Sequence, residues 1–597
     1  YFPLSEDDFS VAHAAKVNNR RTERRMARSI NSEKPNTKNN YSHTLLPPYD
    51  KHPVIVHELG QWSVFPDFKE IKKYSGVFLP RNLEVFKTRL EQKGMSDMAD
   101  KFLLSSGKLS ALLYKEEIER CLRTPGLDGF QLLDLRDYQA QGSALIGLLN
   151  AFWESKGLVT PEEFRSSCNA VSILLQMEKR TWQNNENFIA DVVIPNYSPK
   201  ELNNVEITWE VSFTDKNIAS GQLTDISVKQ GSVGTCGKIE FPLQNISEAT
   251  QMKIEIAIKN TDIKNKYDIW VYPHVLPEDK GNIIIATETN DSLLQQIKNG
   301  ANVLLIPKDL NDREKMTFAT PFWSTILFDY QPKTMGIYCD PKHPIFKYFP
   351  TDSWSNWQWW ELTQKGYCAR LNHTDASYRP ILQVIDHPVR NDKLGAIMEA
   401  RIGMGKLLVC TIDISSKLQT RPVARQLRYS ILQYMKSPEF MPQENDRLMT
   451  SIFSEKSNLE YKRLSTDNDS SEFPVMFAFD NDEKSYWEIK SPDNKPISVN
   501  IELARERYIT GCRLNVPEGE IKDFSVIVSP QKIGKKKTNL PPAIKGDGTP
   551  NKNWESELWD NGFTVQNGRK GKFIQIKITP VSGQTIHLKE FSFIFGD

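Results

Sequence analysis

The sequence predicts a multidomain chain that combines α/β and all-β folds. At 597 residues it is longer than a single hydrophobic core usually spans. Short apolar runs alternate with helical patterns in residues 1–165 and 280–438, which is typical of α/β domains. Residues 170–275 and 471–597 instead alternate apolar and polar side chains with the period of a strand. Residues 440–470 are polar and rich in Ser, Asn and Asp, which predicts a linker.

The composition excludes several classes of partner. With 76 Lys and Arg against 75 Asp and Glu, the chain has no basic excess to attract nucleic acid or an anionic membrane. No run approaches the roughly 18 apolar residues of a membrane span. The 7 Cys are scattered without metal-binding spacing, so we expect buried free thiols. The chain begins at Tyr1 and carries no signal-like segment, so we expect a piece of a longer protein.

The strongest candidate site lies in the stretch KHPVIVHELGQWSVFPDF, residues 51–68. Pro53–Val56 is a short β-branched run that predicts a buried strand, and it delivers Glu58 to the strand's C-terminal end. In a (β/α)8 barrel the loops at that end build the active site, so Glu58 is a candidate catalytic carboxylate. The alternative is a strand-end carboxylate that pairs with a neighbouring Lys or Arg.

Helices and a second strand follow this segment. Apolar residues recur at helical spacing in 83–103, and Tyr114–Thr124 predicts an amphipathic helix that stops at the following Pro-Gly pair. Gly129–Leu133 predicts a second buried strand, and Leu145–Trp153 predicts a further helix after a polar loop. Strand, helix, strand, loop and helix in this order form the end of a βα repeat.

Two of these segments resemble a known enzyme family. PVIVHELGQW resembles the nucleophile strand of clan-A retaining glycosidases, and specifically of the glycoside hydrolase family 2 β-galactosidase and β-glucuronidase group. In that family the seventh strand of the barrel ends in such a Glu. GFQLLDLRDYQAQG resembles the eighth strand and its loop, which closes the sugar pocket. The resemblance implies that residues 1–165 are the C-terminal part of a (β/α)8 TIM barrel. The better-known members carry a Trp where this chain has Leu132 and Leu133, which leaves the sugar open.

The resemblance also implies roles for the side chains around the two strand ends. Glu58 would be the nucleophile of a retaining, exo-acting, β-galactosidase-like hydrolase that acts on terminal sugars of complex glycans. The side chains placed to orient Glu58 or to meet the sugar are His57, Gln61 and Trp62. The loop after the second strand could bind hydroxyls through Asp134, Arg136, Asp137 and Gln141. The alternative for Arg136 and Asp137 is that they pair with each other.

Retaining hydrolysis needs a second carboxyl group, about 5 Å from the nucleophile, as acid/base. In the resembled family this Glu lies on the fourth strand, which is upstream of the segment present here. We therefore expect a chain that is catalytically incomplete and does not close a barrel. The second hypothesis is a non-catalytic fragment that binds carbohydrate or serves as a scaffold. Neither hypothesis requires a cofactor for catalysis.

The middle of the chain predicts two further domains. Residues 170–275 predict an immunoglobulin-like β-sandwich with a scaffold role. Residues 280–438 predict a largely parallel sheet and resemble the amidotransferase-like domains of several β-galactosidases, but Cys410 lies within a strand run and is no amidotransferase nucleophile. GMGK at Gly403–Lys406 predicts a hairpin turn rather than a phosphate loop. Four Trp in Trp354–Trp360 predict aromatic packing, with projection toward the barrel mouth as the alternative.

Residues 471–597 resemble a discoidin-like jelly roll, a fold that often serves as a carbohydrate-binding module. In related modules the stretch that contains Asp480 and Asp482 opens a loop that can hold a structural Ca²⁺, and a plain turn is the alternative. The expected partner is an oligo- or polysaccharide, and the expected location is secreted, periplasmic or cell-surface. The sugar, its linkage and the oligomeric state are not set by these patterns.

Overall fold

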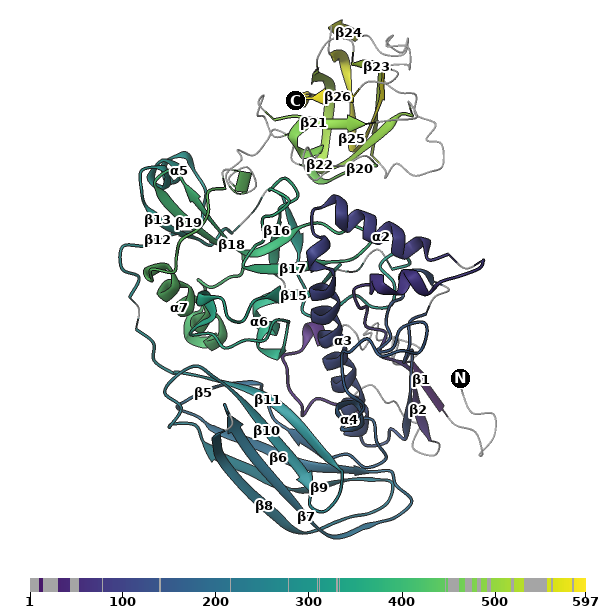
Figure 1. Ribbon diagram of the computed structural model, residues 1–597, viewed down its shortest axis with the longest axis vertical. Coiled ribbons are helices and arrows are strands. Elements are labelled where there is room, and N and C mark those ends of the chain that lie inside the picture. Colours follow the sequence, from purple (N-terminus) through teal and green to yellow (C-terminus); the bar gives the residue numbers. More distant parts are fainter. Residues whose placement is uncertain are drawn as a thin grey trace.

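The computed structural model of the chain is shown in Figure 1. It describes residues 10–13, 30–42, 53–448 (apart from 78, 139–140, 215, 278, 309, 311, 329–330, 332, 365 and 446), 452, 461–467, 475–479, 485–490, 495–516, 520–530, 556–559, 562–581 and 585–596. None of the helices in these residues is long and apolar enough to cross a membrane.

A three-stranded parallel sheet opens the chain. Its strands, in spatial order, are β1 (Ser10–His13), β2 (Val54–Leu59) and β3 (Gly129–Leu132). Between β2 and β3 run η3 (Phe68–Lys73), α2 (Arg81–Gln92), η4 (Ser96–Met98) and α3 (Ala99–Leu122). The order of β2, the helices and β3 is the one predicted from the sequence, whereas β1 was not predicted. Three strands do not form a closed barrel, so membership of a TIM barrel stays a prediction.

Helix α3 is buried far more than an amphipathic surface helix. It packs against β2 and β3 and against β15 (Thr334–Cys339) of the α/β region, and Figure 1 shows it standing between these sheets. Its second half buries Glu116, Glu117, Glu119 and Arg120 together with the apolar residues. The helix predicted at Tyr114–Thr124 is confirmed as the last part of α3, but its expected polar face is wrong, because these charged side chains face packed neighbours instead of water.

The helix predicted at Leu145–Trp153 is also wrong. Residues 141–155 form turns and isolated bridges, including one between Arg136 and Leu149. The N–H of Gly147 donates to Asp137 Oδ1 at 2.9 Å, and a Cβ built on Gly147 would lie 2.2 Å from the carbonyl carbon of Arg136. The chain around Gly147 packs against the backbone of residues 136–137 and therefore does not form the predicted helix.

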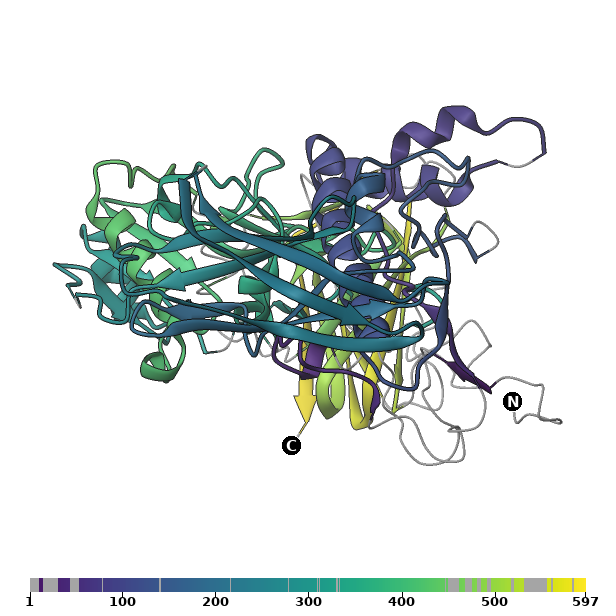
Figure 2. The ribbon, with the colours of Figure 1, turned by 90° about the horizontal axis from the view of Figure 1, so that it is seen from below.

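The next region forms two facing sheets, as Figure 2 shows from below. A five-stranded sheet has the order β5-β11-β10-β7-β8 and a three-stranded sheet the order β4-β6-β9. The short helix α4 (Pro161–Arg165) precedes them, and the strands are β4 (Leu174–Gln176), β5 (Thr181–Gln183), β6 (Asn187–Asn196), β7 (Leu202–Phe213), β8 (Lys216–Val228), β9 (Ser232–Pro242), β10 (Thr250–Ile258) and β11 (Lys264–Tyr272). The alternation expected of residues 170–275 is seen in β7 and β10, which pair antiparallel with Ile254 opposite Val211.

An eight-stranded mixed sheet follows. Besides β15 its strands are β12 (Ile284–Ala286), β13 (Asn302–Leu305), β14 (Arg313–Lys315), β16 (Tyr367–Arg370), β17 (Leu382–Asp386), β18 (Leu394–Ile402) and β19 (Gly405–Cys410). Its helices are α5 (Asp291–Lys298), η6 (Pro344–Phe346), η7 (Trp357–Trp359), α6 (Trp360–Thr363), η8 (Leu418–Thr420) and α7 (Pro422–Lys436).

The prediction of a largely parallel sheet is wrong. Only the pairs β12–β13 and β13–β19 are parallel among the described strands of this sheet. Strands β17, β18 and β19 follow one another through short connections, which give antiparallel pairs because a parallel pair needs a long crossover. The hairpin predicted at Gly403–Lys406 is confirmed, because β18 and β19 pair antiparallel around Gly403, whose φ is +57°. Trp357, Trp359 and Trp360 are buried, as the packing interpretation expected.

The C-terminal region is all β. Its elements are β20 (Tyr461–Thr466), η9 (Val475–Ala478), β21 (Trp487–Lys490), β22 (Ile497–Asn515), β23 (Ile521–Ser529), β24 (Ser556–Trp559), β25 (Gly562–Pro580), β26 (Thr585–Leu588) and β27 (Glu590–Gly596). They form a six-stranded and a two-stranded sheet around a core of their own. Strand β20 lies inside the predicted linker 440–470 and pairs with β22, so the linker is shorter than predicted.

One hydrophobic core unites the other three regions. It contains Trp62 after β2, Leu109 of α3, Trp270 of β11, Trp357 of η7 and Leu427 of α7. Because these side chains share one cluster, the sheet that carries Glu58, the sandwich and the mixed sheet support each other. All 7 Cys are free and all but Cys168 are buried, as expected for structural thiols.

Candidate functional site

The candidate site is the C-terminal end of β2. Glu58 has φ +60°, and Gly60 and Gln61 follow with φ of +98° and +72°. Left-handed conformations in non-Gly residues are uncommon and cluster at functional sites. The side chain of Glu58 is 28% exposed, and its Oε1 lies 3.7 Å from His57 Nε2. The chain thus turns sharply to present a partly accessible carboxylate beside an imidazole.

Two side chains of helix α3 hold this turn in place through hydrogen bonds. Glu117 Oε2 accepts hydrogen bonds from the Gly60 N–H at 3.0 Å and from Trp62 Nε1 at 3.1 Å. The hydroxyl of Tyr114 accepts the N–H of Gln61 at 3.3 Å and lies 3.1 Å from the carbonyl oxygen of Asp134. Two side chains of one helix therefore fix the backbone after Glu58 and tie it to the end of β3.

Glu117 is buried, and this burial raises its pKa from the usual 4.5 to about 8. Its two hydrogen bonds and the nearby Arg120 oppose that shift, because they favour the charged form. Sequence reasoning missed Glu117. The available signal was its position on the apolar stripe with Leu113 and Cys121, where an exposed Glu is not expected.

Two of the residues predicted to orient Glu58 or to meet the sugar, Gln61 and Trp62, pack beneath the strand end. Trp62 is 1% exposed, and its indole N–H is taken by Glu117. Gln61 is buried, and its Nε2 donates to the carbonyl oxygen of Glu58 at 2.8 Å. The structure therefore assigns both residues to the support of Glu58 and not to a surface that faces a ligand.

The loop after β3 begins next to the end of β2. The N–H of Leu133 donates to the carbonyl oxygen of Leu59 at 2.9 Å, and the Leu133–Asp134 peptide bond is cis. Asp134 Oδ1 accepts the N–H of Leu135 at 2.6 Å. The loop thus brings Asp134 to the same edge of the sheet as Glu58.

Asp137 differs from its prediction. It is buried and its Oδ1 forms an ion pair with Lys156 Nζ at 2.7 Å, both side chains being at most 2% exposed. The alternative pairing of Arg136 with Asp137 is therefore wrong, and so is the prediction that Asp137 binds a sugar hydroxyl. Arg136 instead places its guanidinium 5.2 Å from the centre of the Trp153 ring.

A loop of the mixed-sheet region completes the surroundings. The N–H of Trp323 donates to the carbonyl oxygen of Gln61 at 2.7 Å, and the N–H of Ser63 donates to that of Pro321 at 2.9 Å. The indole N–H of Trp323 donates to Gln141 Oε1. Gln141, which was predicted to bind a sugar hydroxyl, therefore holds the loop that carries Trp323. No local pattern reveals this contact, because only the fold brings residue 323 to residue 61.

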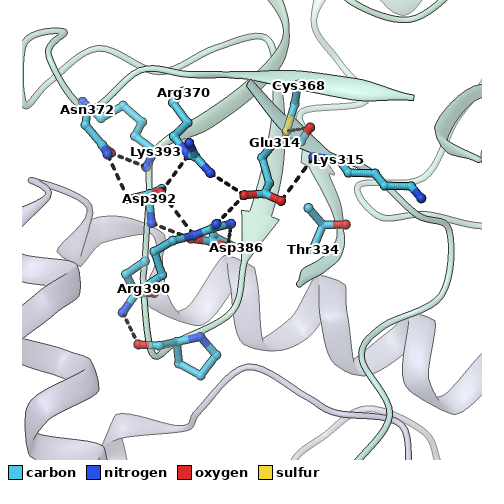
Figure 3. A network of polar contacts seen from close by, with 12 residues as sticks. Glu314, Lys315, Thr334, Cys368, Arg370, Asn372, Asp386, Arg390, Asp392 and Lys393 are labelled. Atoms are coloured by element: carbon cyan, nitrogen blue, oxygen red, sulfur yellow. Dashed lines mark hydrogen bonds and ion pairs between the residues drawn. The ribbon is translucent and has the colours of Figure 1, made fainter. Parts of the chain in front are cut away.

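A second polar cluster lies in the mixed sheet, and Figure 3 shows it at close range. Arg390 binds Asp386 through two hydrogen bonds of 2.7 Å and also pairs with Glu314, while Arg370 lies 3.0 Å from Asp392. The neighbouring Arg side chains lower the pKa of Asp392 to about 2, against the effect of its burial. Each charged group in the cluster pairs with an opposite charge, so we assign the cluster a structural role.

No group of three or more His, Cys, Asp and Glu in the described part of the chain is arranged to hold a metal ion. Asp480 and Asp482, the predicted Ca²⁺ ligands, lie outside the described residues. The Ca²⁺ site stays a prediction.

Comparison with known families gives two partial matches. Residues 284–451 match a domain of unknown function (DUF8487), and residues 186–273 match another (DUF8488). Neither match covers half of the chain, so no family is assigned. No curated protein matches the chain.

Several solved structures resemble a part of the chain. A family 32 carbohydrate-binding module of Clostridium perfringens NanJ, in complex with galactose, is 17% identical, with 22% of this chain and 91% of that chain covered and a TM-score of 0.17. A chitosan-binding module of a Paenibacillus sp. IK-5 chitosanase/glucanase, in complex with chitotriose, is 18% identical, with 23% and 98% covered and a TM-score of 0.19. The family 89 glycoside hydrolase of Clostridium perfringens is 13% identical, with 23% and 14% covered and a TM-score of 0.17. TM-scores this low carry no argument about fold or function.

Proposed function

We propose that this chain supplies the nucleophile strand of a retaining glycoside hydrolase that acts on terminal sugars of an oligo- or polysaccharide. The observation that carries the proposal is the placement of Glu58. Its partly exposed carboxylate stands at the C-terminal end of the middle strand of a parallel sheet, next to the end of β3. This is the edge at which βα folds build their active sites.

The surroundings of Glu58 suit a nucleophile. A nucleophile must be ionised and held in a fixed attitude when it attacks the anomeric carbon. Glu117 and Tyr114 fix the backbone of the turn, and the His57 ring stands beside the carboxylate. Attack by a Glu58 oxygen forms the glycosyl–enzyme ester, and water then hydrolyses it. The proposal requires a second carboxyl group about 5 Å from Glu58 to protonate the leaving oxygen and to activate that water.

The test is hydrolysis of nitrophenyl glycosides by the protein, compared with its Glu58→Gln variant. We expect the variant to lose roughly three orders of magnitude or more in kcat, as expected when a covalent nucleophile is removed. Glu84→Gln is the matched control, because Glu84 lies on α2 in an exposed pair with Arg81. Turnover by this control should be unchanged.

A second readout separates chemistry from folding. A 2-deoxy-2-fluoro glycoside should leave a covalent adduct on the peptide that contains Glu58, seen by mass spectrometry. Azide should restore turnover to Glu58→Ala by replacing the missing carboxylate. Normal turnover by Glu58→Gln, or an adduct on another residue, would remove Glu58 from the mechanism and leave the carbohydrate-binding alternative.

A further inference from the structure

A tryptophan stands exposed on the loop that follows β3. Trp153 is 63% exposed and is the most exposed tryptophan among those whose side chains the structure describes. A large aromatic ring is normally among the more buried side chains, so its exposure costs stability. One exposed aromatic ring does not by itself mark a binding surface, so the inference depends on the groups that surround Trp153.

The turn that carries Trp153 is rigid. Asn150, which is 3% exposed, accepts the N–H groups of Phe152 and Glu154 on its Oδ1 at 2.9 Å and 3.0 Å. The N–H of Trp153 donates to the carbonyl oxygen of Asn150 at 3.1 Å, and Trp153 adopts φ +66°. The ring of Phe152 packs edge-on against Tyr74 with centroids 5.0 Å apart. The backbone that carries the indole is therefore fixed before any ligand arrives, which reduces the entropy lost on binding.

Arg136 lies against this ring and has no counter-ion among the residues described. Its guanidinium carbon is 5.2 Å from the Trp153 centroid, a cation–π contact. The two carboxylates nearest in sequence are engaged elsewhere, Asp134 by the N–H of Leu135 and Asp137 by Lys156. A half-buried guanidinium without an acidic partner is suited to an anion from outside.

The pair lies close to the proposed nucleophile. Leu133 binds Leu59, the residue after Glu58, and Arg136 follows Leu133 by three residues, which span at most about 10 Å. Leu149 donates to the carbonyl oxygen of Leu135 at 2.9 Å, so the turn with Trp153 stays beside the start of this loop. An oligosaccharide with one sugar at Glu58 could therefore place a neighbouring sugar on Trp153.

We propose that Trp153 and Arg136 form a subsite for an anionic sugar, a uronate or a sulfated sugar, next to the unit that Glu58 attacks. The indole offers a flat apolar face to the C–H groups of the sugar ring, and the planar guanidinium accepts a carboxylate or sulfate through paired hydrogen bonds. The position next to the reacting sugar rests on the proposed function. Binding of the anionic sugar to the pair does not.

The test is calorimetric titration of the full chain with three probes: trigalacturonic acid, a sulfated carrageenan oligosaccharide and neutral galactotriose. We expect at least one anionic probe to bind about tenfold or more tightly than the neutral probe. Arg136→Gln should abolish that preference, and Arg136→Lys should restore part of it without the paired geometry. Trp153→Ala should weaken all probes about tenfold. Added salt should shrink the anionic preference in the wild type and not in Arg136→Gln.

Matched controls come from exposed residues elsewhere. Arg401→Gln removes a charge that is 46% exposed in the mixed sheet, and Phe213→Ala removes an aromatic ring that is 40% exposed at the end of β7. Neither should alter binding. Equal affinity for anionic and neutral probes, no binding of any probe, or a preference that survives Arg136→Gln would each overturn the subsite. Retained hydrolysis by Glu58→Gln together with a lost preference in Arg136→Gln would overturn only the proposed function.

Discussion

Replacing Gly60 with alanine tests whether helix α3 sets the shape of the turn after Glu58. Gly60 has φ +98°, and an added Cβ would lie 2.2 Å from Tyr114 Cε1 and 2.7 Å from its Cζ. The left-handed conformation costs about 1–2 kcal/mol for a residue with a Cβ, and overpacking a buried ring costs about 1–3 kcal/mol more. Tyr114 cannot swing aside freely, because it is 1% exposed and its hydroxyl is held at Asp134. We expect Gly60→Ala to destabilise this region by about 2–5 kcal/mol.

The matched control is Gly76→Ala. Gly76 also has positive φ, at +73°, but nothing lies within 4 Å of its would-be Cβ, so only the backbone term of about 1–2 kcal/mol applies. Hydrogen exchange at increasing denaturant measures the local free energy of opening, on peptides that cover residues 53–65 for Gly60→Ala and on peptides that cover Gly76 for the control. In a Tyr114→Ala background the extra cost of Gly60→Ala should disappear, which a double-mutant cycle detects as coupling. The reasoning is refuted if Gly60→Ala costs no more than Gly76→Ala or if the cycle shows no coupling.

Two further predictions concern buried charges. Burial raises the pKa of Glu117 from 4.5 to about 8, so between these pH values the folded protein keeps a proton on Glu117 that the unfolded chain releases. The contribution of this proton to the free energy of unfolding is complete below pH about 4.5 and is lost as the pH rises to about 8. Glu117→Gln should remove this pH dependence, which is worth up to about 5 kcal/mol. If the difference in Tm between the variant and the wild type stays constant between pH 5 and 8, this prediction is contradicted. Arg390→Met should cost about 3–5 kcal/mol in chemical unfolding, because the buried Asp386 loses the two hydrogen bonds from Arg390 and keeps only the one from the Asp392 N–H among those to described residues. Arg401→Met, which breaks only the exposed pair with Glu444, should cost at most about 1 kcal/mol, and equal costs for the two variants would refute the assignment.

Local patterns predicted the elements that local chemistry determines. The β-branched run Pro53–Val56 is a strand because it is apolar on both faces, and the Gly403 turn makes a hairpin because only a residue without a Cβ adopts its φ easily. The strand end that carries Glu58 was recognised for the same reason.

The failures have one common cause, which is that the partner of a side chain is set by the fold. Glu117 reads as a solvent-facing charge until β2 and its turn place two N–H donors against it. The apolar spacing in Leu145–Trp153 suits a helix, yet Gly147 must let another backbone segment pass. The contact of Trp323 with Gln61 joins residues that no sequence window contains together. A single sequence shows the donors and acceptors but not their pairing.

The loop of the mixed sheet that reaches the Glu58 turn limits how freely this chain can be divided. Ser63 and Trp323, 260 positions apart, are joined by a hydrogen bond of 2.8 Å beside two backbone bonds between the same segments. The mixed-sheet domain is thus not an exchangeable module. A shortened protein that stops before it would lose one wall of the turn, and a graft from a relative would have to bring a loop of matching length and hydrogen-bonding pattern. Selection for chemistry at Glu58 should therefore leave its mark on residues far along the chain.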